Sequence, residues 1–196
     1  MNALTVYHCI LNYTIALFKC FHRNYIIPIQ YNVIMASEDL LNKLNNQIKR
    51  QFKNAVCGSG KAPSTIMLIG EAPNLEEVKQ SKPFVGKAGK FLWTELEKIG
   101  LKRPQIYVTN AIKYQIDRPS AKHIDLCLPY LEQEIQIIKP KTIIALGKTA
   151  LKALKKTKVS GIKIIASPHP SAAMRFPKQK TLFKLGLKLI KGIKNA

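Results

Sequence analysis

Hydrophobic residues along this chain follow two alternating patterns. The first consists of short, almost wholly apolar runs, which predict buried strands, at residues 65–70, 105–110, 141–147 and 161–167. In the second, apolar residues recur every three or four positions, which predicts helices over residues 38–52, 87–100, 121–139, 148–156 and 181–193. The stretch at residues 58–64 is rich in Gly, Pro and Ser, and it predicts a loop.

Local signals suggest where these helices begin and end. Ser37 is expected to cap the first helix, because two acidic residues follow it in the first turn. Gly100 is expected to end the second helix, since glycine adopts the left-handed backbone of a helix C-terminus. Pro129 is expected in the first turn of the third helix and not in its middle, because proline lacks the backbone donor.

Apolar strands that alternate with helices indicate a parallel sheet covered on both faces. The sequence therefore predicts an α/β fold, a three-layer α/β/α arrangement around a central four-stranded parallel sheet. In such sheets, ligands bind beyond the carboxyl ends of the strands. That rule brings distant parts of the chain to one edge, namely Glu71, Ala72, Asn110, Gly147 and His169.

The first 34 residues differ from the rest of the chain. They contain no acidic residue, and polar residues interrupt their apolar stretches. They lack the uninterrupted span of about 20 apolar residues that a membrane helix needs, and also the pattern of a secretory signal. We expect residues 35–196 to form the folded domain. Residues 1–34 are expected to be an extension, either upstream of a natural start at Met35 or an organelle-targeting segment; without such targeting, the cytoplasm or nucleoid is expected.

The charge of the chain is strongly positive. Lys and Arg number 32 against 11 Asp and Glu, a formal net charge of +21, and from Lys139 onward there are fifteen basic residues and no acidic one. A field of this sign attracts polyanions. A nucleic-acid partner is therefore favoured, and a merely solubilising lysine-rich surface is the alternative. An anionic membrane is arguable only for the last twenty residues.

The predicted edge of the sheet gathers four kinds of chemistry. Glu71 offers a carboxylate that can orient water, and Asn110 offers a carboxamide that can donate and accept at once. Phe84, in the loop after the first strand, offers a stacking face. His169 can stabilise a developing anion. Together with the basic surface, they indicate an enzyme that flips a base out of DNA.

Each of these residues also has a structural explanation when taken alone. Asn110 suits a turn, and His169 between two prolines suits a rigid loop. Phe84 suits the core, and Glu71 suits a helix cap. The functional interpretation depends on their convergence at one edge.

Several motifs of the chain match one family in order and spacing. They are GEAPN at residues 70–74, PFVGKAG at residues 83–89, a strand ending in TN at residues 109–110, and SPHPSAAMR at residues 167–175. From Ile66 to Arg175 the chain closely resembles the family 4 type of uracil-DNA glycosylase. The resemblance implies that Glu71 holds the attacking water and stabilises the oxocarbenium-like sugar, while His169 stabilises the uracil anion at O2.

The resemblance also implies a base-binding and a DNA-binding group of residues. Phe84 stacks on the flipped uracil, and Asn110 binds its O4/N3 edge and discriminates against cytosine. Glu77 crowds the C5 position against the methyl group of thymine, and Ala72 lies beside the base. The DNA-binding residues are expected in the loop that enters the duplex, at Ser171, Ala172, Met174 and Arg175, with an apolar wedge.

The cysteines depart from the family pattern. The family holds a four-iron, four-sulfur cluster through four cysteines, but here only Cys127 matches a ligand position. Tyr114 occupies the third ligand position, residues 45–54 contain no cysteine, and Cys57 lies beyond the expected pair. Cys9 and Cys20 are not expected to compensate. We therefore expect no metal and no cofactor, with reduced thiols and intact chemistry.

A second departure is Asn74, which stands where the family usually has Gly. Asn tolerates a left-handed backbone better than most residues, so the turn is expected to survive.

The sequence thus predicts a monofunctional, monomeric uracil-DNA glycosylase that starts base-excision repair on uracil-containing DNA, without a lyase lysine. Two alternatives stay open: a relative that prefers hypoxanthine or xanthine, and a DNA-binding member without turnover.

Overall fold

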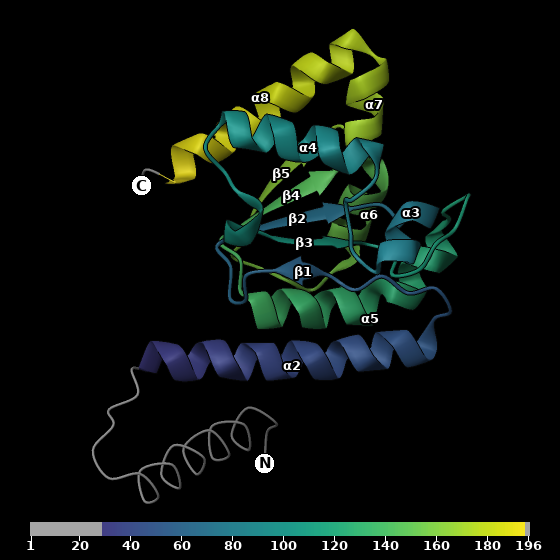
Figure 1. Ribbon diagram of the computed structural model, residues 1–196, viewed down its shortest axis with the longest axis vertical. Coiled ribbons are helices and arrows are strands. Elements are labelled where there is room, and N and C mark those ends of the chain that lie inside the picture. Colours follow the sequence, from purple (N-terminus) through teal and green to yellow (C-terminus); the bar gives the residue numbers. More distant parts are fainter. Residues whose placement is uncertain (1–28, 195–196) are drawn as a thin grey trace, which may run out of the picture. The chain divides into compact units, whose positions relative to one another are not determined.

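The computed structural model describes residues 29–194 (Figure 1). The residues from Ile34 onward belong to one compact unit. Most of the expected extension, residues 1–34, lies outside the described residues. Among the helices described, none combines the length and the apolar character needed to cross a membrane.

The centre of the fold is a five-stranded sheet with the order β1-β3-β2-β4-β5. Four strands are parallel, as predicted: β2 (Ile66–Gly70), β3 (Tyr107–Asn110), β4 (Thr142–Leu146) and β5 (Lys163–Ser167). The predicted count of four strands is one short, because β1 (Ser59–Gly60) pairs with β3 in the antiparallel sense.

The short β1 comes from the segment predicted to be a loop. Gly60 has φ +131, and a Cβ there would lie 2.0 Å from the carbonyl oxygen of Ile106. This strand is paired through its backbone at close approach, so it leaves no periodic apolar pattern in the sequence.

Helices cover both faces of the sheet (Figure 1). One face carries α5 (Ala121–Ile138) and α6 (Lys148–Lys156), and α2 (Ile29–Gln51) packs outside α5 through its residues from Leu41 onward. The other face carries α4 (Lys87–Lys98) and α8 (Pro177–Lys194). The shorter elements are α3 (Leu75–Gln80), the 3-10 helix η1 (Arg103–Gln105) and α7 (Pro170–Arg175).

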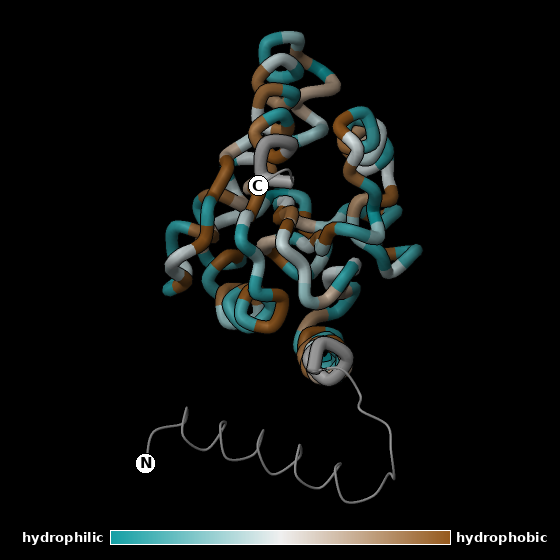
Figure 2. The backbone as a smooth tube through the Cα atoms, turned by 90° about the vertical axis from the view of Figure 1, so that its left-hand side faces the viewer, coloured by the Kyte–Doolittle hydropathy of each residue, from teal (hydrophilic) through white to brown (hydrophobic). Residues whose placement is uncertain are grey.

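Successive strand residues point into two separate cores, as expected of strands buried on both faces. Met67, Ile69 and Tyr107 face the α5 side. Leu68 and Val108 face the α4 and α8 side. The amphipathic helices that cover them alternate hydrophobic and hydrophilic residues along their turns (Figure 2).

Two predicted helix positions are wrong. Ser37 does not cap α2, which begins at Ile29; it lies inside the helix and is 8% exposed. Its spacing from Leu41 continues the buried stripe of α2, and this packing prevails over a local capping signal. Pro129 lies inside α5 and not in its first turn. Its ring is exposed, while the buried Cys127 and Leu131 hold the helix in place on either side.

The predicted end of α4 is confirmed. Gly100 follows the last helical residues with φ +78, and its N–H donates to the carbonyl oxygen of Glu97 at 2.9 Å.

Four rings, called here the aromatic cluster, join three segments of the α5 side. Phe52 follows α2, Tyr114 follows β3, and His123 and Tyr130 belong to α5. The Phe52 and Tyr114 rings stack at 4.9 Å between centroids, and Tyr130 meets Phe52 edge-on at 5.5 Å. His123 meets Tyr114 edge-on at 6.3 Å. Tyr114 is therefore the centre of the packing that links the end of α2 to α5.

Replacing Tyr114 tests how much this cluster stabilises the fold. We expect Tyr114→Ala to lower the free energy of unfolding by about 2–3 kcal/mol, because it removes two ring contacts and part of the packed area. Tyr114→Phe retains the ring and serves as the control, with a loss below about 1 kcal/mol. Urea unfolding measures both changes. An alanine variant with the wild-type midpoint would contradict this role of the ring.

Candidate active site

The structure brings the predicted edge residues together at the carboxyl ends of β2, β3, β4 and β5. The segment after β3 continues the sheet, since Ala111 N–H donates to the Gly70 carbonyl and Ile112 N–H donates to the Glu71 carbonyl, both at 2.9 Å. The prediction that these strand ends meet is confirmed. Asn110 and Glu71 are therefore held in register by backbone bonds.

Asn110 and Phe84 meet above Gly70. A Cβ on Gly70 would lie 2.3 Å from Asn110 Oδ1 and 2.5 Å from Phe84 Cζ, so only glycine leaves room for both side chains. Asn110 is 2% exposed, and within the described part of the chain its Nδ2 has no hydrogen-bond partner. An unpaired buried donor costs about 1–3 kcal/mol. This donor is thus available to a ligand that enters beside the Phe84 ring.

The Phe84 backbone is held in a conformation that aromatic residues rarely adopt. Its φ is +54, in the left-handed region, and its side chain is 3% exposed within the core of the α4 side. The structural explanation of Phe84 as a core residue is therefore also correct. Strain of this kind persists only where surrounding contacts enforce it.

Three residues, called here the Phe84 clamp, supply those contacts: Glu77, Trp93 and Arg103. Phe84 N–H donates to Glu77 Oε1 at 2.6 Å, and the Phe84 carbonyl accepts from Trp93 Nε1 at 3.0 Å. Arg103 donates to the carbonyls of Phe84 and Pro83, at 3.5 and 2.7 Å, and lies 4.6 Å from the centre of the Trp93 ring. The clamp thus binds both polar groups of the Phe84 backbone.

Glu77 also connects the clamp to α3. Its Oε2 accepts from Asn74 N–H, and Asn74 Oδ1 accepts from Glu77 N–H, each at 3.0 Å, which forms a capping box. Burial raises the pKa of Glu77, and backbone donors and Arg103 partly oppose this. Asn74 does not use the left-handed backbone that it was expected to tolerate: its φ is −93, and its side chain caps α3.

Glu71 is oriented by a residue that was not among the predicted site residues. Thr149 Oγ1, in the first turn of α6, donates to Glu71 Oε2. A cavity of about 500 Å³ opens beside Glu71, and Gln115 and Asp117 lie among the residues that line it. The position of Thr149 two residues after Gly147, at the same predicted edge, is the signal that identifies it.

His169 caps α7 with its ring. Nδ1 accepts from Ser171 N–H at 3.3 Å and lies 2.8 Å from Ser171 Oγ. A backbone N–H can only donate, so Nδ1 is unprotonated and the neutral ring carries its hydrogen on Nε2. Burial lowers the pKa of His169, which Glu71 partly offsets and Arg175 reinforces. His169 therefore presents an Nε2–H donor while it stays neutral.

The position of His169 depends on Gly147. This glycine has φ +96, and a Cβ there would lie 3.1 Å from His169 Cβ. The His169 ring lies 6.3 Å from the Phe84 ring, between centroids. Imidazole, aromatic ring and carboxamide therefore share one site.

The remaining predicted residues lie on α7. Ser171 and Ala172 are half-buried, whereas Met174 is 48% exposed and Arg175 is exposed. Phe176, which follows directly and is 55% exposed, was not among the predicted residues. The end of α7 thus presents two exposed apolar side chains, Met174 and Phe176, on either side of Arg175 in the sequence.

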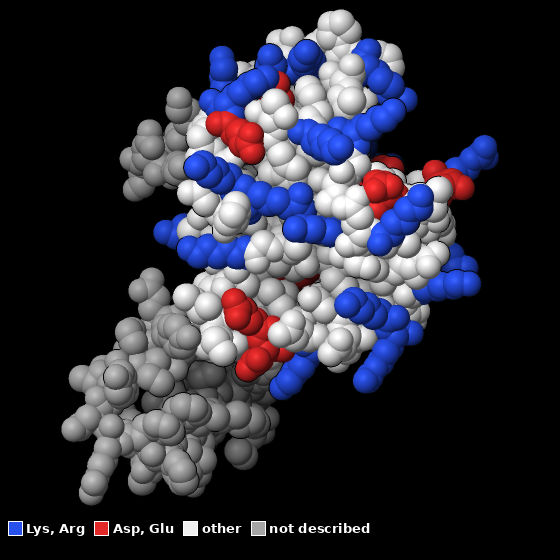
Figure 3. Space-filling view, in the orientation of Figure 1, with Lys and Arg blue, Asp and Glu red and all other residues white. Residues whose placement is uncertain are grey.

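Lys and Arg also outnumber acidic side chains over the face drawn in Figure 3.

The thiols that the structure describes do not fit the cluster that the resemblance implies. The Cys127 sulfur accepts from Lys113 N–H, the Cys57 thiol faces the Asn45 carbonyl, and burial raises the pKa of both thiols. Tyr114, at the third ligand position, belongs to the aromatic cluster. Within residues 29–194, no group of three or more His, Cys, Asp or Glu side chains is placed to hold a metal ion. Cys9 and Cys20 lie outside the described residues.

Comparison with known proteins identifies the same family as the sequence motifs. The family model of the uracil DNA glycosylase superfamily matches residues 57–190. A type-4 uracil-DNA glycosylase from Pyrobaculum aerophilum is 32% identical over 163 residues, covering 71% of this chain and 83% of the relative. That of Sulfurisphaera tokodaii is 35% identical over 166 residues, covering 72% and 76%. That of Saccharolobus solfataricus is 36% identical over 149 residues, covering 64% and 69%.

The matched region contains every residue assigned to the site, from Glu71 to Phe176. The chain therefore belongs to the uracil-DNA glycosylase superfamily, and within it to the type-4 uracil-DNA glycosylases.

Proposed function

We propose that this chain hydrolyses the N-glycosidic bond of uracil in DNA, releasing the free base and leaving an abasic site. The observation that carries this proposal is the buried, unpaired Asn110 Nδ2 beside the Phe84 ring, at the same strand edge as Glu71 and His169. A flat base that presents an acceptor next to a donor satisfies that carboxamide. Uracil, with O4 beside N3–H, is such a base.

Base recognition follows from the two side chains above Gly70. Phe84 stacks on the flipped ring while Asn110 donates to O4 and accepts from N3–H. Cytosine presents the opposite order, an amino donor beside an acceptor, and so leaves the buried carboxamide mismatched. Ala72 lines the site beside Glu71. Exclusion of thymine is assigned to Glu77, whose carboxylate is held rigidly by Phe84 N–H and Asn74 N–H.

Bond cleavage uses the remaining two groups. As the C1′–N1 bond breaks, its electron pair leaves with the base, and His169 Nε2–H donates a hydrogen bond to the anionic O2. Glu71 stabilises the positive sugar and orients the water that attacks C1′. The proton of that water passes through the carboxylate to solvent, and the uracil anion takes up a solvent proton. Thr149 keeps one carboxylate oxygen of Glu71 in place.

Release of uracil from a labelled oligonucleotide tests this function. Glu71→Gln should lower the single-turnover rate by about 10²–10⁴-fold, because it removes the base and the negative charge. His169→Ala should lower it by about 10²–10³-fold, because the anion loses its donor. Glu97→Gln, an exposed carboxylate of α4 away from the cavity beside Glu71, is the control and should act like wild type. A wild-type protein that leaves uracil in place would refute the proposal.

The Phe84 clamp predicts that activity falls when a supporting residue is replaced, even though that residue does not contact the base. Arg103→Met should reduce kcat/KM by about tenfold or more, since Phe84 loses a support and small misplacements are costly in catalysis. Arg118→Met removes the same charge from an exposed position and is the control. Equal kinetics for the two variants would show that the clamp has no part in positioning the ring.

The exposed side chains of Met174 and Phe176, at the end of α7, predict a difference between double-stranded and single-stranded substrates. Phe176→Ala and Met174→Ala should each slow release from double-stranded DNA by about tenfold, because a wedge offsets the cost of unstacking. Release from single-stranded DNA should change less than about twofold, since no duplex has to be opened. Leu189→Ala, a comparably exposed position of α8, is the control. Equal losses on both substrates would rule out a wedge.

A further inference from the structure

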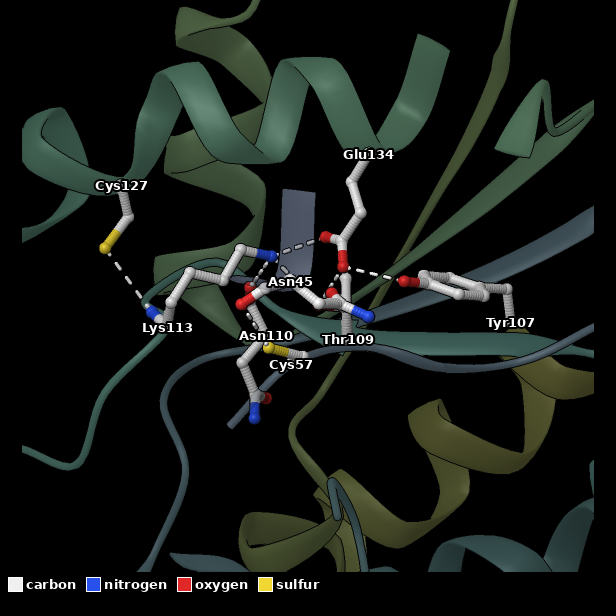
Figure 4. A network of polar contacts seen from close by, with 8 residues as sticks. All are labelled: Asn45, Cys57, Tyr107, Thr109, Asn110, Lys113, Cys127 and Glu134. Carbon is white, nitrogen blue, oxygen red and sulfur yellow. Dashed lines mark hydrogen bonds and ion pairs between the residues drawn. The ribbon is translucent and has the colours of Figure 1, made fainter. Parts of the chain in front are cut away.

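A buried ion pair lies on the opposite side of β3 from the base-binding residues (Figure 4). The side chains of Lys113 and Glu134 are both fully buried, and Nζ lies 2.5 Å from Glu134 Oε2. Lys113 follows β3 and Glu134 belongs to α5. Neither residue has a role in the proposed chemistry.

The hydrogen bonds of this pair are complete. Lys113 Nζ uses its three donors on Glu134 Oε2, on Thr109 Oγ1 at 2.9 Å and on the carbonyl oxygen of Asn110 at 2.9 Å. Glu134 Oε1 accepts from Tyr107 OH at 2.8 Å and from Thr109 Oγ1 at 3.1 Å. Burial and Glu134 raise the pKa of Tyr107 well above its ordinary value, so its hydroxyl stays a donor.

Such a pair is a poor source of stability. Removing two charges from water costs about as much as their attraction returns, and apolar residues of similar volume often serve as well. A buried ion pair whose hydrogen bonds are all made does, however, fix the position of every group that it binds. The group of interest is the Asn110 carbonyl, because the side chain of the same residue binds the base.

The geometry links this carbonyl to the site. Along β3, Tyr107 packs on the α5 side and Val108 on the opposite side, so Thr109 faces the pair whereas the Asn110 side chain faces Phe84. The next two backbone N–H groups bind the carbonyls of Gly70 and Glu71. Displacing the turn at residues 110–113 therefore moves the carboxamide against the Phe84 ring and alters the backbone bond to Glu71.

We propose that Lys113 and Glu134 are positioning residues, which hold the turn at residues 110–113 so that the Asn110 carboxamide meets the edge of the base. This inference rests on the proposed function, because it assigns the pair a part in base recognition.

The test uses the double variant Lys113→Met/Glu134→Gln. Removing only one partner leaves a buried unpaired charge and unfolds many proteins, whereas the double variant buries no charge. The amide that replaces the Glu134 carboxylate retains an acceptor for Tyr107 and Thr109, while the Asn110 carbonyl loses its Lys113 donor. Urea unfolding verifies that the variant folds. The matched control is Lys156→Met/Asp125→Asn, which removes an exposed 2.5 Å ion pair that also involves α5.

The expected result is a loss of kcat/KM that depends on Asn110. The double variant should reduce kcat/KM for uracil-DNA by about tenfold, the size of coupling found between contacting residues. In an Asn110→Ala background the same changes should cost less than about twofold, because the side chain to be positioned is gone. The control pair should have no effect in either background. Equal losses in both backgrounds, or no loss at all, would overturn the inference.

A second measurement separates this inference from the proposed function. The side-chain amide signal of Asn110, identified by its absence in Asn110→Ala, should shift in the double variant and not in the control, as seen by ¹⁵N NMR. A wild-type protein that fails to release uracil would overturn the proposed function, whereas the amide signal still decides whether the pair positions Asn110. An unmoved signal would overturn the inference whatever the activity.

Discussion

The parallel pairing of β2 with β3 continues past the ends of both strands, and the site depends on that continuation. Ala111 and Ile112 donate to the carbonyls of Gly70 and Glu71, so the backbone that carries Asn110 is joined to the backbone that carries Glu71. Two groups that we propose to act on opposite sides of the scissile bond are thereby held by the sheet itself. Sites held by rigid elements keep their geometry better than sites built on loops alone.

The groups that do lie on loops are held by side chains instead. Phe84 adopts a strained backbone that three residues enforce, and His169 is fixed by the cap that its own ring makes on α7. Glycine makes room in both places, at Gly70 under the Phe84 ring and at Gly147 beside His169. The site is thus preorganised by close backbone approach and by strain that the scaffold sustains.

On the α5 side of the sheet, aromatic packing stands where the family resemblance implies a metal cluster. Where the family resemblance implies metal ligands, this chain places the stacked rings of Phe52 and Tyr114 beside the buried Cys127. Ring packing links the end of α2 to the segment after β3 through contact area and without coordination bonds. The support lies behind the sheet, while the site residues lie at the strand ends and on the opposite face.

The sequence by itself determined the order along the chain of the four parallel strands and the five longer helices, the two-sided burial of those strands, and the edge where Glu71, Asn110 and His169 meet. It did so because hydrophobic residues recur along the chain with the period of each strand or helix, and because parallel strands place their carboxyl ends at the same edge of the sheet. Tertiary structure alone decided the backbone pairing of β1, the extent of α2 and the place of Pro129 within α5. Local signals there were outweighed by packing between elements.

Tertiary structure also decided the contacts that hold the site. Thr149 and Glu71 lie 78 positions apart, and Lys113 and Glu134 lie 21 apart. A hydrogen bond between distant residues leaves no periodic trace in either segment, since it forms only where folding brings a donor and an acceptor together. The sequence therefore predicted the residues that we propose to meet the substrate, and only the folded chain showed which residues hold them in place.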